Sequence, residues 1–183
     1  MTRAEQPASP EQESLAAGDR LAEHSILTRE LSEFLQSGLS IIIAAVGRDG
    51  RPVAGVALAC VIDPDGTTRI IMRRAANPRL LEAVADGSAF AATLSRPITH
   101  RSIQLKSAGA REVPLRPGEE AAVARQSAVF RDELIAVDHD VPFANAYTAY
   151  RPMDLTVLEF RPEDAFVQTP GPGAGARLAG APR

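Results

Sequence analysis

The chain has 183 residues, of which 20 are basic and 23 acidic, giving a formal net charge of -3. This length suits one domain with a substantial core. A charge so close to balance creates no field that would gather nucleic acid or an anionic membrane surface. We therefore expect small-molecule or protein partners, and neither nucleic acid nor a membrane.

The single cysteine, Cys60, lies within the apolar run Val53 to Ile62, so no disulfide framework is possible within the chain. The N-terminus has no apolar stretch that resembles a signal sequence, and no run is long enough to cross a bilayer. The sequence predicts a soluble, cytoplasmic protein with a buried, inert thiol.

Composition divides the chain into three parts. Residues 1–20 are polar and poor in large apolar groups, which predicts a flexible N-terminal tail. Residues 169–183 are small and rich in glycine and proline, which predicts a flexible or surface-wrapping C-terminal tail. Residues 21–168 carry the periodic apolar pattern of a folded domain.

The first half of this domain reads as one helix followed by three strands. Apolar residues from Leu27 follow helical spacing, and the helix is expected to end near Ser37. Isoleucine-rich and β-branched runs, separated by Asp-Gly turns, then predict strands at Ser40 to Val46, Val53 to Ile62 and Thr67 to Met72.

The second half alternates helices and strands. Asn77 followed by proline predicts the start of a short helix that Gly87 closes. Further strands are predicted at Ala89 to Leu94, Ser102 to Ala110 and Met153 to Phe160, with a longer helix between Gly118 and Val137.

This order predicts a mainly β fold with helices (α+β) and about six antiparallel strands. A parallel, doubly wound sheet is excluded because no crossover helix separates the first three strands. A closed or partly closed barrel would protect the edges of so many strands.

Two basic residues mark a candidate anion site. Arg73 and Arg74 directly follow the third strand and precede the helix that starts after Asn77. Guanidinium groups and backbone amides gathered at one point suit a phosphate monoester. The alternative is an ordinary strand end exposed to solvent.

A second candidate lies on the strand that starts at Ser102. Ser102, Gln104 and Lys106 alternate with Ile103 and Leu105, so three hydrogen-bonding side chains share one face of this strand. They could line a polar site, or they could belong to an ordinary half-exposed strand.

Other motifs carry less weight. His100 has no acidic partner nearby in the sequence, so it is a weak candidate for a catalytic acid. The three histidines lack metal-ligand spacing, and no metal site is expected. Gly171, Gly173 and Gly175 do not follow a strand that leads into a capped helix, which excludes a dinucleotide-binding loop. No catalytic residue is identified.

Three segments resemble a known family: SIIIAAVGRDGRPVAGVALACVI, IIMRRAANPRLLEAV and THRSIQLKSAG. Over roughly Leu27 to Gln168 the chain resembles the pyridoxamine 5'-phosphate oxidase-like, FMN-binding split-barrel proteins. The resemblance implies a split β-barrel, FMN as cofactor, and a homodimer with the flavin at the subunit interface. A monomer would leave the isoalloxazine ring exposed.

The resemblance also implies which residues bind the cofactor. Arg73 and Arg74 would contact the FMN phosphate, while Ser102, Gln104 and Lys106 would face the flavin and its phosphate. The register along this strand is open, so Arg101 could replace one of the three. These cofactor-binding candidates are Arg73, Arg74, Arg101, Ser102, Gln104 and Lys106.

The implied activity is an FMN-dependent oxidoreductase acting on a small molecule. Vitamin-processing members of the family carry an Arg-x-His signature near the C-terminus, whereas Arg151 to Arg183 contains no histidine. Pyridoxamine phosphate is therefore not the expected substrate. Two alternatives stay open: a noncatalytic flavin- or haem-binding module, and a deazaflavin-dependent reductase.

Overall fold

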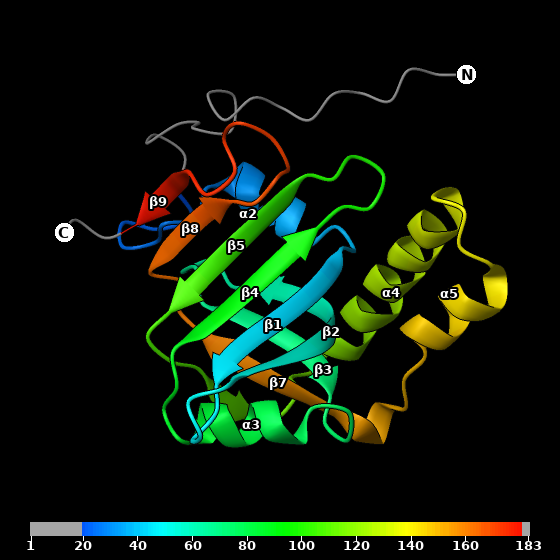
Figure 1. Ribbon diagram of the computed structural model, residues 1–183, viewed down its shortest axis with the longest axis horizontal. Coiled ribbons are helices and arrows are strands. Elements are labelled where there is room, and N and C mark those ends of the chain that lie inside the picture. Colours follow the sequence, from blue (N-terminus) through cyan, green and yellow to red (C-terminus); the bar gives the residue numbers. More distant parts are fainter. Residues whose placement is uncertain (1–19, 181–183) are drawn as a thin grey trace.

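The computed structural model describes residues 20–180 (Figure 1). The predicted N-terminal tail thus lies outside the described residues, except for Arg20. The helices are α2 (Arg29–Leu35), α3 (Pro78–Ala85), α4 (Glu119–Ala136) and α5 (Val141–Thr148), with a 3-10 turn at Pro152–Asp154. The strands are β1 (Ser40–Val46), β2 (Pro52–Ile62), β3 (Thr68–Arg73), β4 (Phe90–Ser95), β5 (Ser102–Ser107), β6 (Arg111–Val113), β7 (Leu155–Phe160), β8 (Asp164–Val167) and β9 (Arg177–Gly180).

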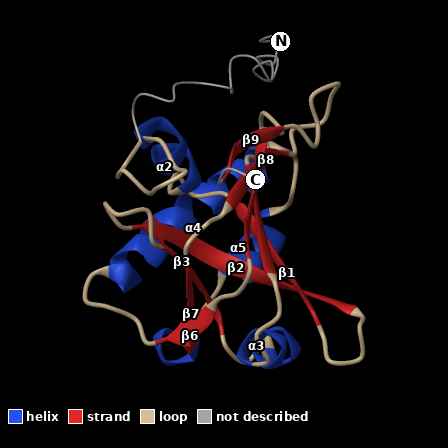
Figure 2. Ribbon diagram, turned by 90° about the vertical axis from the view of Figure 1, so that its left-hand side faces the viewer, coloured by secondary structure: helices blue, strands red, loops and turns tan. Residues whose placement is uncertain are grey.

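All neighbouring strands are antiparallel and form one sheet in the order β6-β7-β3-β2-β1-β4-β5-β8-β9. Although β5 and β6 lie far apart in this order, only residues 108–110 connect them, a link that reaches about 14 Å at most. The rings of Phe90 on β4 and Phe160 on β7 also meet, with centroids 4.8 Å apart. The sheet therefore curls into a barrel that is split between β5 and β6 (Figure 2).

Alternating side chains fill the inside of this barrel. Ile41 and Ile43 on β1, Leu94 on β4, and Ile103 and Leu105 on β5 are at most 1% exposed. Burying one such side chain contributes about 1.5–3 kcal/mol. The period of two along each strand thus fixes which residues face the core and which face outwards.

Helix α4 covers the outer face of β2, β3 and β7, where Val123 packs against Leu58, Ile71 and Val157. Helix α5 packs on α4, and both lie to one side of the sheet in Figure 1, which leaves the outer faces of β1, β4 and β5 without a helix. Helix α3 closes the lower end of the barrel. Among residues 20–180, no helix combines the length and apolar character required to span a bilayer.

Two glycines permit close packing. Gly38 has φ +89°, and a Cβ there would lie 2.8 Å from the Gln126 carbonyl oxygen of α4. A Cβ on Gly55 would lie 2.0 Å from the Asn77 side-chain oxygen. Glycine therefore allows α4 and the start of α3 to approach the barrel.

The predicted mainly β fold class with helices is confirmed, but the strand number is not: the sheet has nine strands instead of about six. Strands β6, β8 and β9 have only three or four residues, too few for a clear alternating pattern. The predicted strand Ser102 to Ala110 is also wrong at its end, because the chain leaves β5 after Ser107 and resumes as β6 beside β7. Part of the C-terminal tail forms β9, which pairs with β8.

Candidate functional site

Gln104 and Lys106 of β5 face outwards, as the alternation along the strand predicts. Gln104 is half-buried, and its amide donates a hydrogen bond to Thr93 Oγ1 at 3.0 Å. Lys106 is exposed, and its ammonium group lies 4.6 Å from the centroid of the Phe166 ring. These two residues and Thr93 form a polar border along the outer face of β4 and β5.

Ser102 lies at the start of the same strand and is buried. Its hydroxyl is 2.7 Å from Ser95 Oγ and 3.0 Å from the carbonyl oxygen of His100. Its backbone amide donates to Thr169 Oγ1 at 3.0 Å. The Ser102 hydroxyl therefore already has partners within the chain.

A row of outward-facing residues crosses the sheet at the level of Gln104. The cross-strand pairs are Val56 with Ile42, Ile42 with Thr93, and Thr93 with Gln104. Ile42 is 51% exposed, and Val46 farther along the same strand is 52% exposed. This outer face is thus apolar in its middle and polar along β5, and none of the helices α2 to α5 covers it in Figure 1.

Arg73 lies at the other end of this row. Arg73 follows Met72, which pairs with Ala57, so it lies beside Val56. The Asn77 side-chain amide joins the two positions, since it donates to the Arg73 carbonyl oxygen at 2.7 Å and to the Val56 carbonyl oxygen at 3.3 Å. The Arg73 Nη1 donates to the Ala149 carbonyl at 3.0 Å. Its Nε is buried and has no hydrogen-bond partner in the described part of the chain. A buried, unpaired donor of this kind fits an anionic ligand group.

Arg74 has a different environment. Its side chain is 61% exposed and donates to Glu112 Oε1 at 2.6 Å. The next amide, that of Ala75, donates to the Asp154 carboxylate at 2.8 Å. The turn after β3 therefore already holds two carboxylates, and a phosphate here would compete with them.

Arg101 points away from the β5 row. Its guanidinium carbon lies 4.2 Å from the centroid of the Phe34 ring of α2, and Glu30 of the same helix is 3.9 Å away. The structure therefore groups Arg101 with α2 and not with Gln104 and Lys106.

The structure thus brings three of the predicted residues together, Ser102, Gln104 and Lys106, and separates them from Arg73. Strands β2, β1 and β4 lie between β3 and β5. Four strand spacings correspond to about 19 Å, so Arg73 and Gln104 of one subunit cannot contact the same phosphate. Sequence reasoning missed Ile42 and Thr93, although alternation within their strands places both on the outside.

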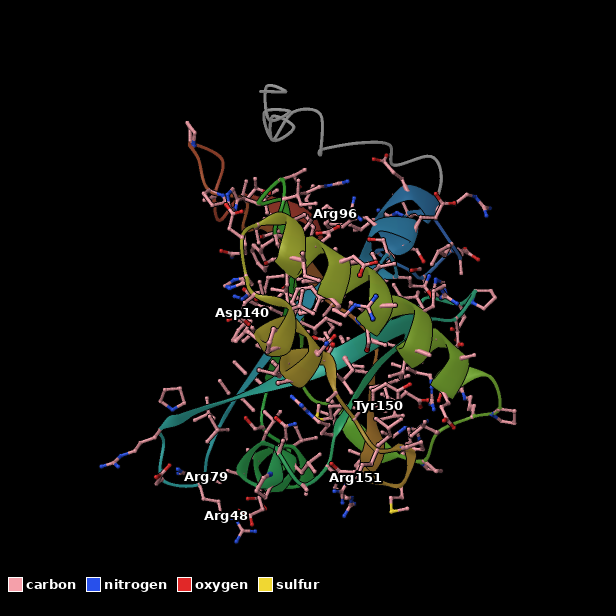
Figure 3. The ribbon with its side chains drawn as sticks, turned by 90° about the vertical axis from the view of Figure 1, so that its right-hand side faces the viewer. Arg48, Arg79, Arg96, Asp140, Tyr150 and Arg151 are labelled. Atoms are coloured by element: carbon pink, nitrogen blue, oxygen red, sulfur yellow. The ribbon has the colours of Figure 1, made fainter. Side chains whose placement is uncertain are left out.

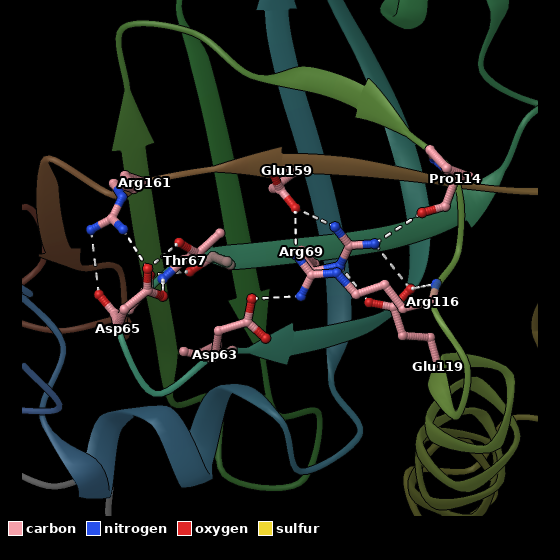
Figure 4. A network of polar contacts seen from close by, with 12 residues as sticks. Asp63, Asp65, Thr67, Arg69, Pro114, Arg116, Glu119, Glu159 and Arg161 are labelled. Carbon is pink, nitrogen blue, oxygen red and sulfur yellow. Dashed lines mark hydrogen bonds and ion pairs between the residues drawn. The ribbon is translucent and has the colours of Figure 1, made fainter.

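A cluster of charged side chains lies elsewhere (Figure 4). Three of its residues, Arg111, Arg116 and Glu159, also line a cavity of about 620 Å³. Arg69 is 1% exposed and bonds Glu119, Glu159 and the Pro114 carbonyl oxygen. Glu159 also accepts hydrogen bonds from two further arginines, Arg111 (2.9 Å) and Arg116 (3.0 Å).

This cluster affects the pKa of Glu159 in two opposing ways. Burial alone would raise the pKa of Glu159, but the hydrogen bonds from Arg111 and Arg69 outweigh it and hold that pKa below its usual value. Because the arginines and carboxylates satisfy one another, we interpret this cluster as a structural element that joins β3, β6 and β7 to α4.

No protein-family model matches the chain, and no curated protein matches it in sequence. Solved structures with a similar backbone include HupZ of group A Streptococcus, with 15% identity, a TM-score of 0.49 and coverage of 81% of this chain and 99% of that one. A pyridoxamine 5'-phosphate oxidase-related, FMN-binding protein of Nostoc punctiforme has 13% identity, a TM-score of 0.41 and coverage of 79% and 80%. An F420 reductase has 15% identity, a TM-score of 0.45 and coverage of 73% and 94%.

At these identities the likenesses assign neither a cofactor nor a reaction to the chain. The strand order, the curled sheet and the placement of the helices are observed directly in this chain. The chain therefore has a split β-barrel fold, the architecture that its sequence resemblance predicts.

Proposed function

We propose that this protein is an FMN-binding oxidoreductase that acts as a homodimer on a small molecule. One observation carries the proposal: an uncovered outer sheet face combines exposed apolar residues, Ile42 and Val46, with a polar border at Gln104 and Lys106. A planar ring with a polar edge fits such a surface, because its faces need apolar contact and its edge needs hydrogen bonds.

Arg73 is the residue that we assign to the FMN phosphate. Its buried Nε has no hydrogen-bond partner among the described residues, so the guanidinium is only partly engaged and would have to turn for a phosphate to gain a charge-assisted bond from it. Arg74 contributes less, because an ion pair with Glu112 at 2.6 Å already engages it.

The β5 residues would hold the rest of the cofactor. Gln104 would bond the edge of the ring or the ribityl chain, Ser102 would assist from the start of the strand, and Lys106 would add positive charge. Bound FMN supplies hydride and electron transfer at its N5 position, while the protein binds and orients the cofactor and its substrate.

The spacing of these groups favours a dimer. Arg73 and Gln104 of one subunit lie about 19 Å apart along the sheet. A twofold assembly that pairs the outer faces would cover Ile42 and Val46, and it would bring β5 of one subunit towards Arg73 of the other. Each flavin would then contact both subunits.

The first test is the absorbance spectrum of the purified protein, followed by titration with FMN. We expect binding with one FMN per subunit. Arg73→Gln should weaken it about tenfold or more, because a charge-assisted hydrogen bond is lost. Arg74→Gln, the matched neighbour, should weaken it less. A colourless protein that stays colourless after incubation with FMN overturns the proposal.

Assembly and turnover need separate measurements. Ile42→Glu should convert a dimer into a monomer in light scattering after gel filtration, since it places a charge in the centre of the apolar face. Reduction of bound flavin by NADH or NADPH supports the enzyme, whereas binding without turnover indicates a storage or sensing module. A deazaflavin or haem spectrum would identify one of the alternative cofactors.

A further inference from the structure

A second cavity, of about 450 Å³, lies between the barrel and the helices α4 and α5. Its floor contains three serines from adjacent strands: Ser40 starts β1, Ser95 ends β4 and Ser102 starts β5. Ser40 pairs with Ser95, and Ser95 pairs with Ser102, so their hydroxyl-bearing positions form one row. Figure 3 shows this side of the molecule, with Arg96 near one border and Asp140 at the start of α5.

The wall opposite the serines is aromatic. Phe130 of α4 and Tyr147 of α5 make an edge-to-face contact with centroids 5.7 Å apart, and Phe143 lies 5.8 Å from Tyr147. The ring of His139 stacks on Phe143 at 4.8 Å. Contacting rings of this kind provide a surface against which another flat ring can pack.

Several polar groups of the lining have no protein partner. Within residues 20–180, no hydrogen bond joins another protein group to the Ser40 hydroxyl, the Tyr147 hydroxyl or the imidazoles of His100 and His139. Ser95 and Ser102, by contrast, bond each other at 2.7 Å. An apolar wall with a few unpaired polar groups is typical of a small-molecule site.

The polar groups of the lining favour an anion over a cation. Among the described residues no carboxylate lines the cavity, while the hydroxyls of Ser40 and Tyr147 and the imidazole N–H groups can donate hydrogen bonds to an anion. Arg96 also lines the cavity, but Glu133 lies 3.2 Å from it and balances its charge, and the Asp140 carboxylate accepts the Phe143 amide at 2.6 Å. A cationic ligand would find no counter-charge in this lining.

We propose that this cavity binds a planar aromatic carboxylate, with its ring against Phe143 and Tyr147 and its carboxylate towards the Tyr147 hydroxyl and the imidazoles. The proposal goes beyond the flavin function and does not depend on it. The cavity belongs to one subunit, and its lining includes neither Arg73 nor Gln104. Of the residues assigned to the flavin it shares Ser102, whose hydroxyl already bonds Ser95 at 2.7 Å.

The test is a titration of the full chain with 2-naphthoate, followed by the fluorescence of the ligand. The protein has no tryptophan, so its own emission interferes little. We expect saturable binding of one 2-naphthoate per chain. The neutral analogue 2-naphthylmethanol should bind about tenfold more weakly, because it lacks the carboxylate. Cyclohexanecarboxylate does not fluoresce, so it is measured by displacement of 2-naphthoate, and it should also bind about tenfold more weakly because it lacks the planar ring.

Variants locate the site. Tyr147→Phe should weaken 2-naphthoate binding about tenfold, and Phe143→Ala, which removes a half-exposed ring at little risk to the fold, should weaken it further. Ile98→Ala is the matched control, since Ile98 is 48% exposed on the neighbouring loop but does not line the cavity. Circular dichroism would show that each variant is folded.

Two results would overturn the proposal: no saturable binding of 2-naphthoate, or equal weakening by Ile98→Ala and Phe143→Ala in folded protein. Failure of the flavin proposal is recognised separately. Arg73→Gln should reduce FMN binding and leave 2-naphthoate binding unchanged, while Phe143→Ala should do the reverse.

Discussion

Replacing Arg69 by methionine should destabilise the protein strongly. The Arg69 side chain is 2% exposed and bonds two carboxylates, Glu119 and Glu159, that are each 6% exposed. Without Arg69, Glu159 keeps its bonds from Arg111 and Arg116, whereas the Glu119 carboxylate keeps, within residues 20–180, only the bond from the Arg116 amide at 2.7 Å. Removing one partner of a buried ion pair costs about 3–5 kcal/mol, because a charge stays buried without compensation.

Urea unfolding measures this loss, and far-ultraviolet circular dichroism should report it, since the chain has no tryptophan. With a denaturant dependence of about 2 kcal/mol per molar urea, the midpoint should fall by about 1.5–2.5 M. The control is Arg161→Met: the Arg161–Asp65 pair is 60% and 52% exposed, so its loss should cost less than about 1 kcal/mol.

A double variant tests the stated cause. Arg69→Met combined with Glu119→Gln removes the uncompensated carboxylate, so it should recover part of the lost stability. The reasoning is refuted if Arg69→Met and Arg161→Met cost the same, or if the double variant is the least stable of the three.

Three further predictions concern single positions. Gly55→Ala should destabilise the protein by about 1–3 kcal/mol in the same urea assay, because its Cβ would displace the Asn77 carboxamide and break its hydrogen bonds; an unchanged midpoint would contradict this. The pKa of Glu159 is lowered in the folded state, so its contribution to stability is present above its ordinary value of 4.5 and is lost as the pH falls through the folded pKa. Glu159→Gln should therefore flatten the decline of the urea midpoint between neutral and acidic pH, and an equally steep decline would argue against the assignment. Burial raises the pKa of the Cys60 thiol, so a thiol reagent should modify it only when the protein unfolds, and fast labelling of native protein would disprove its burial.

The regular parts of the fold could be predicted from local pattern. The strands from Ser40 and Ser102 alternate clearly, and the inward positions Ile103 and Leu105 are completely buried. Helix α5 was not predicted, although its start carries signals: Asp140 caps it by accepting the Phe143 amide, and a proline follows at its first turn. The buried residues of α5 pack against α4 instead of the barrel, and the apolar residues of this short helix follow no simple period.

The candidate site was harder to predict because it depends on pairings between distant segments. Arg73 and Gln104 were each recognisable on their own strand, but the sequence does not show that β2, β1 and β4 lie between them. The engagement of Arg74 by Glu112 was equally hidden, since Glu112 belongs to a three-residue strand. Short strands and distant ion pairs leave no periodic pattern to read.

The position of β7 has a consequence for how the protein is made. Strand β7 pairs with β3, where its Phe160 lies opposite Thr68, and it also pairs with β6. While a ribosome is still synthesising residues before 155, β3 has a bare edge and β6 has no partner. Such non-local pairing slows folding, and an unpaired edge invites other chains to add to it. Nascent chains that stall before Leu155 should therefore be the form of this protein most dependent on chaperones.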